Sequence, residues 1–168
     1  VRRCWAKIMK ERFGADDPAS MRLRFHCQTA AASLTRQQYK INIVRTGLQA
    51  LAGVLGGAQS LHANGMDEAF TIPTEEAMKI ALRTQQIISE ETNVASVADP
   101  LGGSYYVESL TTEFERGIFS VLDEIDAGGG TVRLVDEGWF QRHIADFAYQ
   151  VALRKQSGEK AVIGVNRF

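Results

Sequence analysis

The chain has 168 residues, of which 45% are hydrophobic and 23% charged, which is close to the average for a globular domain. Its 19 Lys and Arg residues nearly balance its 20 Asp and Glu residues, so charge gives no reason to expect nucleic acid or an anionic membrane as a partner. No apolar run is long enough to cross a membrane, and two cysteines are too few for a disulfide scaffold. A reducing cytoplasm is the expected compartment.

The two ends of the sequence favour a piece of a larger protein. Trp5, Ile8 and Met9 already follow helical spacing, although no capping residue precedes them. The last eight positions, 161–168, form a short apolar run that stops abruptly, whereas chain ends are usually polar. We therefore expect a fragment or an excised domain.

The first two thirds of the chain predict alternating helices and strands. The expected elements are a helix ending before Gly14, strands over 22–27 and 58–62 separated by a helix over 43–55, a helix capped by Thr74, and a third strand over 94–98. Thr74 is a suitable N-cap because its hydroxyl can accept a hydrogen bond from the first turn, and acidic residues follow it.

The last third predicts mainly helices. Thr112 and Glu115 have capping-box spacing, so a helix is expected to begin there and to stop at the three glycines 128–130. A short helix over 132–137, a longer helix over 140–155 and a terminal strand over 161–168 complete the prediction.

This order of elements indicates an α/β fold. The strand centres near 25, 60 and 97 are separated by intervals similar to the roughly 31 residues of one βα unit in a (β/α)₈ barrel. About three units fit, so the chain cannot be a whole barrel, and the same spacing also suits a small autonomous α/β domain.

Polar residues lie at the expected ends of the first two strands. The first strand ends in His26, Cys27 and Gln28, and the second lies in the cluster 59–64, which includes Gln59 and His62. Because ligands of α/β folds bind at the carboxyl edge of the sheet, these clusters predict one shared polar mouth. The alternative is that His26, Gln59 and His62 are structural polar groups at loop junctions.

Other kinds of site have weaker support in the sequence. The three histidines lack metal-ligand spacing, no Cys-x-x-Cys occurs, and no glycine cluster forms a phosphate loop. Cys27 follows His26 directly, so on a strand the two side chains would point to opposite faces and could not form a nucleophile–base pair. Asp67 and Glu68, in the loop after the second strand, are further site candidates.

Several of these segments also carry a family resemblance. They are RFHCQT at 24–29, SLT at 33–35, GAQSLH at 57–62, DEA at 67–69, ADPLGGSY at 98–105 and VIGVN at 162–166. In this order they resemble the large subunits of methylmalonyl-CoA mutases. The resemblance extends from about residue 2 to residue 168.

The resemblance implies an adenosylcobalamin-dependent acyl-CoA mutase, which isomerises a carbon skeleton by radical chemistry. It implies that 1–108 are later βα units of a (β/α)₈ TIM barrel and that 109–168 are the helical segment that follows. The residues that it places against the acyl-CoA substrate are Arg24, His26, Gln28, Gln59 and Ser60. Those that it places against the cofactor are Ala31, Glu68, Ala69 and Ile72.

The sequence departs from the family pattern at two of these positions. Ala31 stands where many relatives have a glycine that approaches the cofactor closely, and Ile72 stands where leucine is usual. Gly138-Trp139-Phe140 resembles the subunits that pair with a separate cobalamin-binding chain.

The resemblance also implies parts that these residues do not supply. They are the N-terminal half of the barrel, the residues that grip the acyl group, and a cobalamin-binding domain or small subunit with the cobalt-ligating histidine. We expect the protein to be an oligomer, located in the cytoplasm or, in a eukaryote, in the mitochondrial matrix. We also expect the chain alone to have unpaired strand edges and unpaired apolar helix faces. The alternative is a non-catalytic fragment or assembly module completed by a partner chain.

Overall fold

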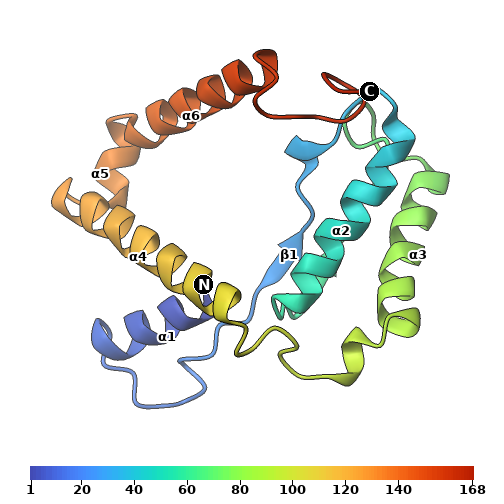
Figure 1. Ribbon diagram of the computed structural model, residues 1–168. Helices are drawn as coiled ribbons and strands as arrows, with labels where there is room; N and C mark the ends of the chain where they lie inside the picture. The colour runs from blue at the N-terminus through green and yellow to red at the C-terminus, as the bar shows by residue number, and fades with distance from the viewer. The chain divides into compact units, whose positions relative to one another are not determined.

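The computed structural model describes residues 1–168, which divide into two compact units, Val1–Val107 and Glu108–Phe168 (Figure 1). The N-terminal unit contains α1 (Arg2–Glu11), β1 (His26–Gln28), α2 (Asn42–Leu55), β2 (Ser60–His62) and α3 (Glu75–Glu91), with 3-10 turns at Ala31–Ser33, Tyr39–Ile41 and Val94–Ser96. The helices α4 (Tyr105–Ala127), α5 (Thr131–Asp136) and α6 (Trp139–Gln156) follow. None of these helices is both long enough and apolar enough to cross a bilayer.

The N-terminal unit is built on two parallel strands joined by a helix. β1 pairs with β2 in a two-stranded sheet, in the register His26–Ser60, Cys27–Leu61 and Gln28–His62. The connecting helix α2 contacts both strands and also α3, which lies beside it in Figure 1. This β1–α2–β2 arrangement confirms the predicted α/β class, with a small sheet in a helix-rich chain.

A glycine lets α2 approach the sheet closely. A Cβ atom added at Gly53 would lie 3.1 Å from Leu61 Cδ1 and 3.3 Å from Cys27 Sγ. Cys27 and Leu61 therefore form the helix-facing side of the sheet, as expected for side chains that alternate between faces. His26, Gln28 and Ser60 belong to the opposite face.

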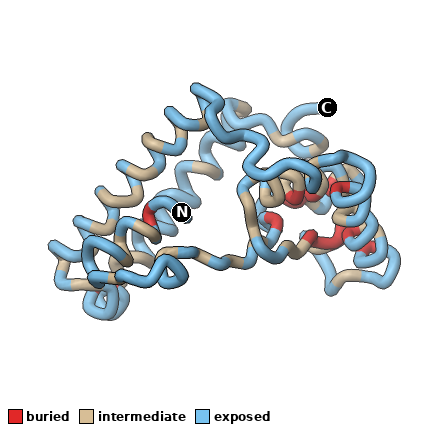
Figure 2. The backbone as a smooth tube through the Cα atoms, turned by 90° about the horizontal axis from the view of Figure 1, so that it is seen from below, coloured by how far each residue is buried: buried red, intermediate tan, exposed pale blue.

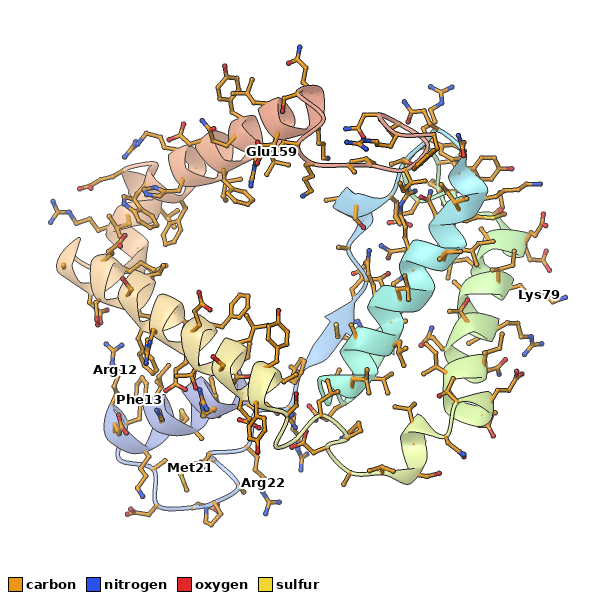
Figure 3. The ribbon with its side chains drawn as sticks, viewed as in Figure 1. Arg12, Phe13, Met21, Arg22, Lys79 and Glu159 are labelled. Atoms are coloured by element: carbon orange, nitrogen blue, oxygen red, sulfur yellow. The ribbon has the colours of Figure 1, made fainter.

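Most of the buried side chains belong to the N-terminal unit, and Figure 2 shows the buried positions in red. α3 buries Ala77, Ala81 and Ile88, which are four and seven residues apart and therefore lie on one face of the helix. Lys79 lies on the side of α3 away from α2 (Figure 3). The helices predicted for this unit are thus confirmed, including the N-cap, because Thr74 Oγ1 accepts a hydrogen bond of 3.3 Å from Ala77 N–H.

Two strand predictions for this unit are wrong in extent or in kind. The first strand covers His26–Gln28 rather than 22–27, and the predicted third strand over 94–98 is a 3-10 turn, Val94–Ser96, followed by exposed residues. A strand requires a neighbour that takes its backbone hydrogen bonds, and segment 94–98 has none. The chain therefore holds two βα units and not the three that were expected.

Two predictions for the C-terminal third are also wrong. α4 begins at Tyr105, and Thr112 lies inside it with Oγ1 donating to the Glu108 carbonyl at 3.0 Å, an arrangement open to threonine within a helix. The terminal segment 161–168 forms turns in place of a strand. Asn166 stabilises these turns, since its side chain donates to the Lys155 and Lys160 carbonyls and accepts from Val162 N–H. The helix stop at 128–130 and both later helices are confirmed.

The C-terminal unit has almost no core of its own. Leu134 is its only buried residue, while Phe114, Ile144 and Phe147 are mostly exposed. The whole chain exposes 12005 Å², whereas two separate compact globules of these sizes would expose about 10,000 Å² in total. The expectation of apolar helix faces left unpaired in the chain alone is confirmed.

An exposed ion pair lies at the C-terminal end of the short helix α5. Arg133 Nε donates to Glu137 Oε1 at 2.7 Å, and this hydrogen bond with the neighbouring negative charge raises the pKa of Arg133 above its usual value. Both side chains are exposed, so the pair contributes little to stability.

Substitutions at two glycines of α2 test the close packing of this helix on the sheet. We expect Gly53→Val to destabilise the native gene product by about 1–3 kcal/mol, because the new side chain would overlap Leu61 and Cys27. Gly47→Ala on the same helix meets only Thr84 Cγ2 at 3.6 Å, so it should be neutral or stabilise by up to about 1 kcal/mol. Urea unfolding checks both, and equal stability of the two variants would contradict this packing.

Candidate functional site

Three exposed polar side chains lie on the sheet face opposite α2. His26 and Gln28 come from β1 and Ser60 comes from β2, and all three are exposed, while His62 is half-buried. We call these four residues the polar face. The register places His26 beside Ser60 and Gln28 beside His62, so the structure brings together the two strand ends that the sequence predicted to share a mouth.

A hydrogen bond joins the two strands across this face. His26 Nδ1 lies 2.8 Å from Ser60 Oγ, and which of the two donates depends on the histidine tautomer. The bond uses one ring nitrogen and leaves the other available to a ligand. A neutral imidazole and a hydroxyl can both donate and accept, which suits carbonyl or amide groups.

Gln28 is oriented by Asn64, which belongs to the predicted polar cluster 59–64 but was not among the residues predicted to contact the substrate. Gln28 Nε2 donates to Asn64 Oδ1 at 2.9 Å, so the Gln28 oxygen remains available as an acceptor. Asn64 Nδ2 donates to the Thr29 carbonyl at 2.8 Å, and Asn64 N–H donates to Thr29 Oγ1 at 3.0 Å. Asn64 is only 1% exposed, so this side chain acts from behind the face. Its place just after the second strand was the one sequence signal.

Two of the predicted substrate residues lie differently. Gln59 Oε1 accepts from Phe25 N–H at 2.8 Å and Gln59 Nε2 donates to the Gly57 carbonyl at 2.9 Å, so both ends of this amide bond to the backbone. For Gln59 the alternative of a structural polar group is therefore favoured. Arg24 is exposed and lies before β1 begins.

The predicted cofactor residues lie in the loops that follow the two strands. Ala31 is exposed in the 3-10 turn after β1, and Glu68, Ala69 and Ile72 follow β2. Ile72 is 89% exposed and Glu68 is half-buried. Because the strands are parallel and paired in register, both loops leave the same edge of the sheet.

The loop after β1 is tied to α2 by Gln49. Its Oε1 accepts from Ala30 N–H and its Nε2 donates to Ser33 Oγ, both at 2.6 Å. Ser33 Oγ in turn donates to the Ala30 carbonyl at 2.7 Å. Ala31 is therefore presented from a fixed turn whose 3-10 conformation is open to any L residue, so the alanine needs no glycine-like backbone.

The structure assembles neither a nucleophile–base pair at Cys27 and His26 nor a metal site. Cys27 faces Gly53 of α2 while His26 bonds Ser60 on the other face, as the alternation predicted. No group of three His, Cys, Asp or Glu side chains is placed to hold a metal ion.

Comparison with known proteins gives the family. The family model described as methylmalonyl-CoA mutase matches residues 1–168, the full length of the chain. The chain belongs to the methylmalonyl-CoA mutase family. The resemblance read from its short motifs is thereby confirmed.

Named relatives match over the same length. The 2-hydroxyisobutanoyl-CoA mutase large subunit of Aquincola tertiaricarbonis is 73% identical over 168 residues, which are 100% of this chain and 30% of that protein. The probable mitochondrial methylmalonyl-CoA mutase of Caenorhabditis elegans is 44% identical, and the methylmalonyl-CoA mutase of Escherichia coli is 40% identical. Each of these two also covers 100% of the chain, which spans 23% of their length. The chain therefore spans less than a third of these relatives.

The hydrogen bonds by which Asn64 joins the ends of β1 and β2 can be tested by replacing its side-chain amide with a carboxylate. We expect Asn64→Asp to destabilise the native gene product by about 1–3 kcal/mol, because the donor to the buried Thr29 carbonyl is lost and a charge is buried beside it. Gln37→Glu, the same change at an exposed residue, should shift stability by less than about 0.5 kcal/mol. Equal melting temperatures for the two variants would contradict the role of Asn64.

Proposed function

We propose that these 168 residues form part of an adenosylcobalamin-dependent acyl-CoA mutase, an isomerase that rearranges the carbon skeleton of an acyl-CoA. The observation that carries the proposal is the exposed polar face on a parallel strand pair in a chain that matches the family over its whole length. Adenosylcobalamin, when bound, supplies the radical chemistry of the 1,2-shift. The residues of this chain bind and orient the substrate and help to exclude water from the site.

In this proposal the chain contributes later βα units of a (β/α)₈ barrel. β1–α2 and β2–α3 are two successive units within 1–108, and 109–168 is the helical segment that follows them. Barrel strands are covered by helices on the outside and expose alternate side chains to the inside. The sheet follows this rule, since Cys27 and Leu61 face α2 and the polar face lies opposite.

The polar face is the proposed acyl-CoA contact. The free ring nitrogen of His26 and the oxygen of Gln28 can hydrogen-bond the thioester or amide groups of the substrate, and Ser60 extends the same wall. Arg24 is exposed before β1, where its charge suits an anionic group of coenzyme A. Gln59 would contribute indirectly, by fixing the backbone at Phe25.

The loop residues fit the proposed cofactor. Ala31, Ala69 and Ile72 expose small or medium apolar side chains, and Glu68 adds a carboxylate that can accept hydrogen bonds. Such a surface suits the face of a large flat macrocycle bordered by amide groups. None of these side chains is a nitrogen ligand for cobalt, so in this proposal a histidine that would ligate the cobalt comes from a cobalamin-binding domain or small subunit.

The identity values favour one acyl group over another. The relative at 73% is named for 2-hydroxyisobutanoyl-CoA, whereas those at 40–44% are named for methylmalonyl-CoA. We place the substrate in the class of branched 2-hydroxyacyl-CoA esters. The compartment is the cytoplasm or, in a eukaryote, the mitochondrial matrix.

The exposed apolar helices support the proposal that other protein covers them. Phe114, Ile144 and Phe147 are too exposed for a stable independent unit, so the N-terminal half of the barrel and further subunits are proposed to cover such faces. The same observation supports the alternative of a non-catalytic assembly module. Activity of the native gene product distinguishes the two.

The assay uses the native gene product that carries these residues, together with its cobalamin-binding subunit where that is a separate chain. With added adenosylcobalamin it should isomerise 2-hydroxyisobutanoyl-CoA, with kcat/KM at least about tenfold above that for methylmalonyl-CoA. Omitting the cofactor should abolish the reaction. Turnover of neither ester, with the cofactor bound, would contradict the mutase proposal and favour the assembly module.

A substitution on the polar face tests its role in the same assay. We expect Gln28→Ala to lower kcat/KM about tenfold, which is the loss of one hydrogen bond to substrate worth about 1.4 kcal/mol. Gln141→Ala, an equal truncation on the exposed surface of α6, should leave the kinetics unchanged. Unchanged kinetics for Gln28→Ala would contradict the assignment.

A further inference from the structure

The loop between β2 and α3, residues 63–74, is organised around a buried carboxylate. Asp67 is only 4% exposed, and its Oδ2 accepts hydrogen bonds of 2.9 Å from both the N–H and the Oγ1 hydroxyl of Thr74. Its backbone carbonyl accepts from the N–H groups of Phe70 and Thr71 at 3.0 and 3.2 Å. One residue therefore bonds both the middle and the end of the loop.

The same contact ties the loop to the following helix. Thr74 is the N-cap of α3, and its hydroxyl oxygen accepts from Ala77 N–H while its hydrogen is donated to Asp67. A carboxylate near a helix N-terminus is stabilised by the positive end of the helix dipole. Asp67, Thr74 and the first turn of α3 thus form one hydrogen-bonded clasp.

Gly65, near the start of the loop, packs closely against this clasp. A Cβ atom at Gly65 would lie 2.8 Å from Asp67 Oδ1 and 3.2 Å from Ala77 Cβ, so only glycine fits without a shift. Oδ1 itself is closed to solvent and has no hydrogen-bond partner. A buried acceptor without a partner lowers stability, so burial of Oδ1 does not stabilise the fold. The contribution of Asp67 is therefore the geometry of the loop, which its Oδ2 bonds to Thr74 define.

The part of the loop between the two ends of the clasp is largely exposed. Ala69, Phe70 and Ile72 are open to solvent, and Glu68 is half-buried. Phe70 makes an edge-on contact with Tyr39, with the ring centroids 5.4 Å apart. Glu68 N–H donates to the Gly65 carbonyl, and Phe70 and Thr71 donate to the backbone carbonyl of Asp67, so the Asp67 side chain acts on this segment through its two bonds to Thr74. Without the clasp, segment 68–72 would sample other conformations.

We propose that Asp67 is a positioning residue that clasps the base of this loop and holds Glu68, Ala69 and Ile72 in the arrangement that receives adenosylcobalamin. The role in cofactor binding rests on the proposed function. If loss of the clasp leaves segment 68–72 in the binding conformation about one tenth of the time, the apparent Kd for the cofactor rises about tenfold.

The experiment compares variants of the native gene product, assembled with its cobalamin-binding subunit where that is a separate chain, without and with cofactor. Asp67→Ala removes the clasp, and Thr74→Val removes its hydroxyl with little change of shape. Thr74→Ser keeps the hydroxyl as the conservative variant, and Ile88→Ala weakens the core of α3 away from the loop. Amide hydrogen exchange of segment 68–72 is measured on the apo protein. Spectroscopic titration then gives the Kd for adenosylcobalamin, and a separate titration gives the Kd for 2-hydroxyisobutanoyl-CoA.

Asp67→Ala and Thr74→Val should accelerate exchange in segment 68–72 and raise the adenosylcobalamin Kd about tenfold, with the Kd for the ester changed less than twofold. Thr74→Ser and Ile88→Ala should match the wild type in the exchange rate of segment 68–72 and in the Kd for adenosylcobalamin. Unchanged exchange in the first two variants would overturn the clasp, and faster exchange with unchanged cofactor Kd would overturn the positioning role. Failure of the wild type, assembled with its cobalamin-binding subunit where that is a separate chain, to bind adenosylcobalamin would instead overturn the proposed function, and the positioning role with it, while the exchange data still decide the clasp.

Discussion

The buried amide of Asn64 joins the ends of the two parallel strands, and the candidate site depends on that junction. Its donor bonds the Thr29 carbonyl, its backbone bonds the Thr29 hydroxyl, and its oxygen receives the Gln28 side chain. A side-chain amide that replaces missing strand partners keeps buried backbone groups satisfied beyond the last ladder bond. The register of β1 and β2, and therefore the pairing of His26 with Ser60, is fixed where the loops begin.

Two loops leave this junction, and in each loop a side chain that does not belong to the exposed surface fixes the backbone by hydrogen bonds. Gln49 of α2 holds the turn that carries Ala31, and Asp67 holds the turn that carries Ala69. Polar groups thus fix the backbone while the exposed positions are small or apolar. Rigid support under exposed residues is what a binding surface requires, since a preorganised site loses less conformational entropy on binding.

Local signals predicted most of the helix ends, because caps and glycines lie within a few residues of what they determine, although the capping-box pattern at Thr112 lies inside α4. The Thr74 cap and the stop at Gly128 are of this kind. The strands were less predictable, since residues 94–98 form a short, mostly apolar segment that resembles a strand but has no neighbour to pair with. Within the site, the face of His26 and Gln28 followed from alternation. That Gln59 bonds backbone and that Asn64 orients Gln28 depends on contacts between distant segments, which no local pattern encodes.

We propose that β1 and β2 are neighbouring strands of a mutase barrel whose polar face meets the acyl-CoA. A cryo-electron microscopy structure of the native gene product with adenosylcobalamin and 2-hydroxyisobutanoyl-CoA tests it most directly. The account predicts both strands inside a closed parallel barrel, with the ester within hydrogen-bond distance of His26 or Gln28. A polar face covered by other protein side chains, with the ester bound elsewhere, would contradict it.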